Sequence, residues 1–570
     1  MKRTSISTAV LTVAALAMGA GPAPVQFTPA ADGITKISRT EAVAGQNAPL
    51  RAPRQMSLKA PAGPTGDEKI ITEAPAGTAR TYVKTDGTTY SYSWLTGVSS
   101  LPLGGALCNI VTTDDGKVYM NNPFSSYISS TPGWLEGTLE GDMMTFRFPQ
   151  LIQQDIYYNE DGSILAQYDY FCMPCSLEEQ EGGGNWYEPT EDQVYSLRVN
   201  SDGTLTPTDP NLCLGRMNWY ENEDGSHEWS WQGQGDRIYG MAPFEAEVAE
   251  IPASVTMEEW NFIEPMAYRP VYVGFEGNNV YVRGIYADIP ESVITGTLDG
   301  DKVTFKSGQF IGIDTSLNRT AYFVGGQAHY TTTDEGERYW DFTPGESLTF
   351  NWDADKKILS TEESMMIAPT AEAKAQLAWT DYPRISAPDA NPVVTALQTP
   401  VITWFMLGSV EYNYPNMMMF DFPSVDADGQ ALPLDNLFFN IIINDEVQTL
   451  YTDEYLGLSE DIEDVPYNLS IDSWDIVGGN TAHTVYIYPN GMDNLGIRTG
   501  YRNGDQVIYS ETAWVDPAEL SSVKAVESAE VTSQAWYDLT GRRVLNPDKG
   551  IYIRVSTLSD GTLRTDKIAR

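Results

Sequence analysis

Short runs that alternate hydrophobic and polar positions recur along most of the chain, and they end at Gly, Asn, Asp or Pro. One such run covers residues 293–298, turns at Asp299-Gly300 and continues through 303–305. Alternation with a period of two predicts half-buried strands, and an Asp-Gly between two such runs predicts a hairpin. Long stretches with helical periodicity are missing, so we expect an all-β protein built from antiparallel strands.

Two regions of the chain share these patterns in the same order. The block GTLEGD at 137–142 matches GTLDGD at 296–301, and each is followed by a Thr-Phe pair at the same distance. Three further matches flank these blocks: 116–120 with 278–282, Tyr-Phe at 170–171 with 322–323, and 197–202 with 350–355. Matches that keep their order indicate duplication. We therefore predict two homologous β modules, at 78–245 and 246–375.

The hairpins of each predicted module follow one another directly. Sequential hairpins either close into an up-and-down barrel or pack as a sandwich. We favour a lipocalin-like or streptavidin-like barrel and keep the sandwich as the alternative. The modules also resemble tandem repeats of exported Bacteroidota proteins, a resemblance that implies export but no particular chemistry.

The region 388–517 has a different spacing, with about seven short strands over about 130 residues, which predicts a sandwich. Examples are the run 437–443, the run 484–488 and the closing strand 506–511 with its Ser-Glu ending. This closing strand is similar to those of fibronectin type III-like modules. The similarity implies a role as a spacer or as a binding surface.

The N-terminal residues have the pattern of an export signal. Lys2 and Arg3 precede an apolar run at 6–18, and small residues follow it. This arrangement predicts a signal peptide over 1–21, followed by a Pro/Ala-rich linker over 22–77. No later segment reaches the eighteen or so apolar residues of a transmembrane helix, so we expect none.

The C-terminal region, 523–570, is predicted to be a small β module with two strands joined by a Gly-Arg-Arg hairpin. It resembles the C-terminal sorting domain of type IX secretion cargo in Bacteroidota. The matching residues are Tyr537, Asp538, Leu539, Gly541 and Arg542, then Lys549, Gly550 and Tyr552. The resemblance implies recognition by the secretion machinery and a place outside the cell or on the outer-membrane surface, with the periplasm as the alternative.

The chain is strongly acidic, with 78 Asp and Glu against 35 Lys and Arg and a formal net charge of −43. Such a surface repels phosphate backbones, so nucleic acid is not an expected partner. No cofactor or metal site is predicted. The Asp-Gly stretches at 114–116, 202–203 and 426–429 fit hairpin turns, with a loosely bound calcium ion as the alternative.

All four cysteines, Cys108, Cys172, Cys175 and Cys213, fall in the first module. Cys172 and Cys175 have the C-x-x-C spacing of redox and zinc sites. No second C-x-x-C completes a zinc site, and acidic residues follow the motif. In an exported protein, disulfides are the expected state, with three possible pairings, and free thiols, a metal site and redox catalysis are the alternatives.

No catalytic motif stands out. The three histidines lie in different regions, and nucleophile-elbow, H-E-x-x-H, P-loop and dinucleotide fingerprints are missing. We therefore expect no enzymatic activity. A glycoside hydrolase, which needs only two carboxylates, stays open as the less favoured hypothesis.

Aromatic clusters in the first module are the one positive indication of binding. Aromatic rings near amides and carboxylates suit sugars, whereas tryptophans two positions apart on one strand face also fit a core. The candidate ligand-binding residues are Trp186, Trp219, Tyr220, Trp229 and Trp231. The hypothesis is a non-enzymatic binding protein for a glycan or a host protein. The alternative is an adhesive or structural spacer.

Overall fold

The computed structural model describes most of the chain from residue 62 onward. The described residues are 62–93, 97–125, 133–158, 163–179, 185–222, 224–332, 338–408, 415–471, 476–477, 481–487, 492–516, 520 and four strands between 531 and 569. The predicted signal peptide and most of the predicted linker therefore lie outside them. Strands dominate this part of the chain, which confirms the all-β prediction.

The chain divides into two compact units, each of which we describe by itself. Unit 1 contains Met1–Glu258, Val271–Asp355 and Leu359–Pro383, and unit 2 contains Glu259–Pro270, Lys356–Ile358 and Arg384–Arg570. No helix in the described residues is long and apolar enough to cross a membrane.

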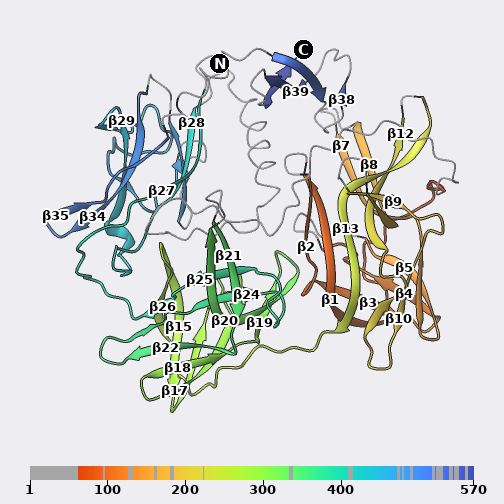
Figure 1. Ribbon diagram of the computed structural model, residues 1–570, viewed down its shortest axis with the longest axis horizontal. Coiled ribbons are helices and arrows are strands. Elements are labelled where there is room, and N and C mark those ends of the chain that lie inside the picture. Colours follow the sequence, from red (N-terminus) through yellow and green to blue (C-terminus); the bar gives the residue numbers. More distant parts are fainter. Residues whose placement is uncertain are drawn as a thin grey trace. The chain divides into compact units, whose positions relative to one another are not determined.

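The first module forms a 13-stranded antiparallel sheet in which eight strands close into a ring (Figure 1). Each ring strand pairs with the next, and the last pairs with the first, so the barrel prediction holds for this module. In order, the ring strands are β1 (Thr78–Ser93), β3 (Leu107–Thr112), β4 (Lys117–Met120), β5 (Leu135–Glu140), β6 (Met143–Arg147), β10 (Val194–Val199), β11 (Leu205–Pro207) and β13 (His227–Pro243). The remaining strands are β2 (Gly97–Pro102), β7 (Gln150–Tyr158), β8 (Ile164–Glu179), β9 (Asn185–Pro189) and β12 (Cys213–Glu221).

The second module repeats this plan as a closed barrel and a separate five-stranded sheet. The barrel strands are β14 (Glu258–Ile263), β15 (Tyr268–Glu276), β16 (Asn279–Arg283), β17 (Val293–Asp299), β18 (Lys302–Lys306), β22 (Ser347–Asp353), β23 (Ile358–Ser360) and β26 (Arg384–Ser386). The sheet has β19 (Gln309–Asp314), β20 (Arg319–Thr332), β24 (Ser364–Ala368) and β25 (Ala378–Asp381), with β21 (Arg338–Pro344) on β20. Its order β19-β20-β24-β25 matches β7-β8-β12-β13 of the first module.

A glutamine at the start of β7 and its counterpart in β19 show that the repeat is structural. Gln150 Oε1 accepts from Glu136 N at 2.7 Å, and its Nε2 donates to the carbonyls of Glu136 and Arg147 at 2.7 and 2.8 Å. Gln309 makes the same three bonds, to Thr295 and to the Lys306 carbonyl, at 2.8 to 3.0 Å. Every partner is shifted by the same number of positions, so the predicted internal repeat is confirmed.

The two modules are joined within unit 1 by a short backbone bridge between Ala106 and Arg319. Arg319 is fully buried, and its Nη1 donates to the carbonyl oxygens of Pro102 and Gly104 at 3.1 and 3.3 Å. A buried guanidinium that is bound to backbone oxygens fixes the two segments against each other.

Unit 2 contains two sheets that share one core, as the sandwich prediction required. One sheet has β27 (Val401–Met406), β28 (Asn416–Asp421), β33 (Ala482–Ile487) and β32 (Ile476–Val477). The other has β30 (Glu446–Val447), β29 (Leu437–Ile443), β34 (Leu495–Asn503) and β35 (Gln506–Tyr509), with β31 (Val465–Pro466) and β36 (Ala513–Trp514) at its sides. Phe420 and Val485 of the first sheet and Phe439 and Ile497 of the second lie in the same buried cluster. The likeness to fibronectin type III modules stays a prediction.

The C-terminal strands form a four-stranded antiparallel sheet in the order β38 (Arg543–Val544), β37 (Val531–Tyr537), β39 (Ile551–Leu558) and β40 (Leu563–Ala569). Tyr537 and Tyr552 of the predicted sorting motif lie on β37 and β39. The other motif residues lie outside the described residues: Asp538, Leu539, Gly541, Arg542, Lys549 and Gly550.

Candidate functional site

The predicted ligand-binding tryptophans of β13 fill the core of the first module. Trp229 and Trp231 are only 8% and 4% exposed. The ring of Trp229 meets Phe171 edge-on at 5.4 Å, and Trp231 packs against Tyr187 at 4.8 Å. Because the two residues are two positions apart on one strand, they share a face, and that face is the buried one. These two residues are therefore corrected from ligand platform to core.

The other predicted aromatics are half-buried where the structure describes their side chains. Trp219 is half-buried, stacks on His227 at 5.8 Å and lies against Gly63, where any Cβ would come within 2.5 Å of the ring. Tyr220 is half-buried, and the side chain of Trp186 lies outside the described residues. The end of the predicted linker thus packs onto the module and covers part of this cluster.

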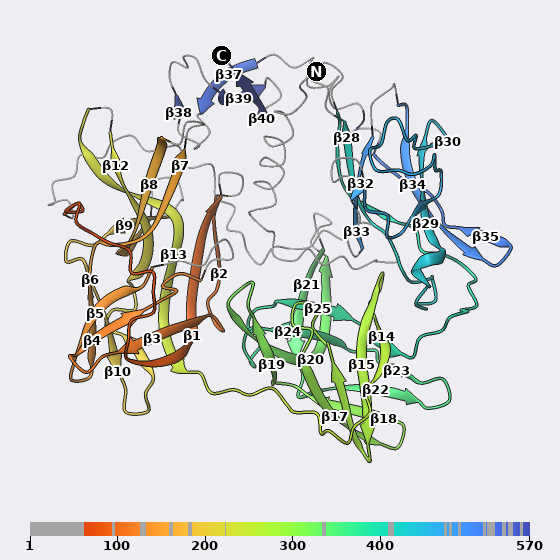
Figure 2. The ribbon, with the colours of Figure 1, turned by 180° about the vertical axis from the view of Figure 1, so that it is seen from behind.

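The exposed aromatic surface of the first module lies instead on the hairpin of β7 and β8. Both views show the ends of β7, β8 and β12 projecting past the ring strands β3, β4 and β5 (Figures 1 and 2). Six large apolar side chains there are between 37% and 65% exposed: Ile156, Tyr157, Tyr158, Ile164, Leu165 and Tyr168. Exposed apolar side chains gathered on one hairpin in this way are typical of an interaction surface.

Strand register gathers the tyrosines on one face of this hairpin. Asp155 pairs with Tyr168, and Tyr157 pairs with Ala166, so these side chains point to the same side. The rings of Tyr157 and Tyr168 meet edge-on at 5.9 Å. Tyr170, two positions after Tyr168, extends the row toward the barrel. We call Asp155, Tyr157, Tyr168 and Tyr170, with Gln153 and Arg216, the tyrosine face.

Polar groups hold the inner end of the tyrosine face in place. The Arg216 guanidinium lies 3.7 Å from the centre of the Tyr170 ring, and its Nη2 donates to Gln153 Oε1 at 3.1 Å. Gln153 Nε2 in turn donates to Asp155 Oδ1 at 2.9 Å. Burial raises the pKa of Tyr170, and Asp155 adds to the rise, so its phenol stays protonated. The face therefore combines fixed rings with a carboxylate, an amide and a cation.

The tyrosine face belongs to the first module alone, because the second module has a shorter hairpin. Gln150 and its partner Cys172 are 22 positions apart in the chain, whereas Gln309 and its partner Phe323 are 14 positions apart. The sequence carries a signal for this difference: the alternation breaks at the consecutive apolar residues 156–158 and 164–165. An alignment of the two modules would therefore have located the surface that our choice of tryptophans missed.

Comparison with known proteins assigns no family. No protein-family model matches this chain, and no curated protein matches it significantly. The geometry of the molecule therefore carries the functional argument alone.

The four cysteines are buried free thiols in the core of the first module. Cys175 lies directly opposite Cys213 on the neighbouring strand. Burial raises the pKa of Cys108 to about 12 and that of the other three well above the usual range. Since the thiolate is the reactive form, none of them is poised as a nucleophile at neutral pH. The structure contains no disulfide among them, and a disulfide pairing stays a prediction.

A buried ion pair beside these thiols was not visible in the sequence. Lys84 Nζ lies 2.7 Å from Asp236 Oδ2, and both side chains are fully buried. The ammonium also donates to the carbonyls of Asn122 and Pro123 and to Ser125 Oγ. Because Lys84 lies on β1 and Asp236 on β13, the buried pair ties these two strands together.

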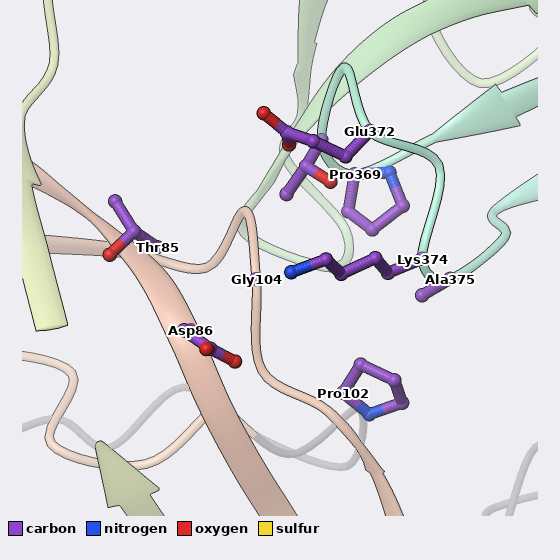
Figure 3. Close-up of a pocket in the computed structure, with 9 residues that line it drawn as sticks. Thr85, Asp86, Pro102, Gly104, Pro369, Glu372, Lys374 and Ala375 are labelled. Carbon is purple, nitrogen blue, oxygen red and sulfur yellow. The ribbon is translucent and has the colours of Figure 1, made fainter. Parts of the chain in front are cut away.

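A small pocket in unit 1 is lined by Asp86, Glu372 and Lys374. Lys374 extends across it toward Gly104, with Asp86 and Glu372 on either side (Figure 3). Its volume is about 30 Å³, which is room for roughly one water molecule. An open hollow of about 320 Å³ adjoins it, but of the two carboxylates only Asp86 lines the hollow. The pocket thus lacks the sugar-sized space between paired carboxylates that a glycoside hydrolase needs.

Carboxylates at the predicted turns are occupied by their own backbones. Asp202 Oδ1 accepts from Thr204 N, and Asp426 Oδ1 accepts from the amides of Asp428 and Gln430. Within the described part of the chain, no group of three or more His, Cys, Asp or Glu side chains has the geometry to hold a metal ion.

Proposed function

We propose that this is an exported, non-enzymatic binding protein that contacts a glycan through the tyrosine face. The observation that carries the proposal is the exposure of Tyr157 and Tyr168 beside a fixed carboxylate. A sugar presents C–H groups on one ring face and hydroxyls at its edge. Exposed tyrosine rings pack against the C–H groups. Asp155 can accept hydrogen bonds from the sugar hydroxyls, and the Gln153 amide can donate or accept them.

The proposal is tested by a glycan-array measurement on the intact protein, in calcium and in EDTA. The double variant Tyr157→Ala, Tyr168→Ala should weaken selective binding by about tenfold or more, since aromatic contacts of this kind contribute about 0.5–1.5 kcal/mol each beyond the area they bury. Tyr382→Ala is the matched control, because Tyr382 is an equally exposed tyrosine of unit 1 away from this face. EDTA should change nothing, because the face itself offers no metal cluster.

Two outcomes would redirect the assignment. A clean blank on the array would favour the alternative, an adhesive or structural spacer, and would move the search to host-protein partners. Binding that survives in the double variant but falls in Tyr382→Ala would place the site elsewhere in unit 1.

We further propose that the secretion machinery recognises the C-terminal sheet and sends the protein to the outer-membrane surface or the medium. The support is the motif resemblance together with a separate small sheet at 531–569. Deletion of 523–570 should trap the protein in the periplasm, as measured by cell fractionation. Unchanged surface display would defeat this part of the proposal without touching the binding site.

A further inference from the structure

Strand β34 in unit 2 alternates glycine and arginine on its outer face. Its sequence runs Gly496-Ile497-Arg498-Thr499-Gly500-Tyr501-Arg502. Ile497, Thr499 and Tyr501 are buried, whereas Arg498 is half-buried and Arg502 is exposed. Because successive strand residues point to opposite sides, the glycines and arginines share the face that is turned away from the core.

Aromatic rings from three neighbouring strands lie between these positions. A Cβ at Gly496 would come within 2.6 Å of the Trp514 ring, and one at Gly500 within 2.3 Å of Phe438. Only glycine leaves room for rings to lie flat on the strand there. The Arg498 guanidinium lies 4.0 Å from the centre of Tyr509, and Arg502 lies 4.4 Å from that of Phe438. Trp514, Arg498 and Tyr509 form the solvent-facing part, which we call the arginine strip.

The outer surface of the arginine strip is open. Trp514 and Tyr509 are 46% and 44% exposed, although both rings are held in place from below. Arg498 is anchored by its Nε, which donates to Asn440 Oδ1 at 3.0 Å. Arg502 is paired with Asp464 at 2.6 Å, whereas no carboxylate among the described residues forms a salt bridge with Arg498. Arg498 therefore presents a fixed cation between two exposed rings.

Charge decides which ligand chemistry fits. The chain carries a net charge of −43, so most of its surface repels an anion. At physiological ionic strength salt screens this repulsion beyond about 8 Å, so the charge next to the ligand, here the Arg498 guanidinium, matters most. The planar guanidinium suits a carboxylate through two parallel hydrogen bonds, and exposed Trp and Tyr rings suit the C–H face of a sugar. We propose that the arginine strip is a second binding site, for a carboxylated glycan of the uronic or sialic acid kind.

The test uses a panel of uronic-acid and sialic-acid oligosaccharides, each beside its methyl ester, on the full-length protein at about 0.15 M salt. Esterification removes the charge and keeps the sugar. The acid form should bind at least tenfold more tightly than its ester, and Arg498→Gln should abolish this preference. Arg498→Lys should restore part of it, since lysine keeps the charge but not the planar fork. Trp514→Ala should weaken both forms alike.

Tyr451→Ala, which removes an equally exposed tyrosine elsewhere in unit 2, serves as the control and should bind as the wild type does. Hydrogen exchange over β34 shows whether each variant stays folded. The Tyr157→Ala, Tyr168→Ala variant should keep this binding, which separates the second site from the tyrosine face. The proposal is overturned by equal affinity for acid and ester, by an unchanged preference in folded Arg498→Gln, or by no binding to any carboxylated member of the panel.

Discussion

The two β modules share one framework and differ in the length of one hairpin, β7–β8 in the first module and β19–β20 in the second. Both have an eight-stranded ring and the same glutamine clamp, Gln150 in one and Gln309 in the other. In the first module the β7–β8 hairpin is longer by the segment that carries the exposed tyrosines. The repeated residues are therefore those that the fold requires, and the candidate binding residues lie where the repeat ends.

The modules also differ in how each stabilises the same buried aspartate. Asp236 pairs in register with Leu214, and Asp381 occupies the corresponding place opposite Ser364. Asp236 is bound by the Lys84 ammonium, whereas Asp381 accepts a hydrogen bond from Ser364 Oγ at 2.5 Å. In the first module the aspartate thus takes part in a buried ion pair, and in the second it takes part in a hydroxyl–carboxylate hydrogen bond.

The largest expected effect comes from making the same substitution in both modules. Asp236→Asn leaves a buried ammonium without its counter-charge, so local stability should fall by about 3–5 kcal/mol. Asp381→Asn keeps an oxygen that can accept the hydrogen bond from Ser364 Oγ, so local stability should fall by only about 1 kcal/mol. Hydrogen exchange of β13 and β25 in the full-length protein measures both. Equal losses would show that the ion pair does not distinguish the modules.

Outside the modules, Asp421 in β28 of unit 2 should govern part of the response to acid. Burial raises its pKa from 3.8 to about 6, so the folded state binds the proton more tightly than the unfolded state. Its contribution favours folding below pH 4 and is lost as the pH rises to about 6, an effect of about 3 kcal/mol.

Asp421→Asn should therefore stabilise the sandwich at pH 7 and remove this loss between pH 4 and pH 6. Hydrogen exchange of β28 and β33 at several pH values measures it, and the exposed Asp505→Asn serves as control. Parallel pH profiles for the wild type and Asp421→Asn would refute the assignment, and the modules should show no change from this substitution.

Gln150 and Gln309, the glutamine clamps, should contribute equally to the stability of their two modules. Gln150→Ala and Gln309→Ala each remove three hydrogen bonds between a hairpin and the neighbouring ring strands. Each should destabilise its own module by about 2 kcal/mol, and by the same amount within error. Exchange rates for β5 and β17 provide the comparison, and a clear inequality would mean that the repeat is conserved in shape but not in energetics.

Local sequence patterns were sufficient for the framework. Asp-Gly turns, period-two strands and the matching blocks at 137 and 296 predicted hairpins, the duplication and a barrel. They could not separate core from surface for Trp229 and Trp231, since alternation marks a shared face without saying which way it points. The pairing of Lys84 with Asp236 depends on ring closure between strands that are far apart in the chain, so no local pattern reports it.

The smallest expected effect on stability comes from shortening the β7–β8 hairpin until it is no longer than its counterpart in the second module. Gln154 pairs with Asp169, so residues 155–168 can be replaced by a two-residue Asn-Gly turn. The side chains removed are mostly exposed, so the rest of the first module should change by less than about 1 kcal/mol. Exchange protection of the ring strands measures this, and their collapse would show that the extension is part of the fold.

The same shortened protein tests the central claim most directly. Its binding to the glycan array, side by side with the wild type, asks whether the surface unique to the first module carries recognition. We predict that the wild type binds a selective set of glycans. The shortened protein, with its ring strands still protected, should lose the same glycans that the Tyr157→Ala, Tyr168→Ala variant loses. Undiminished binding by the folded, shortened protein would contradict the account.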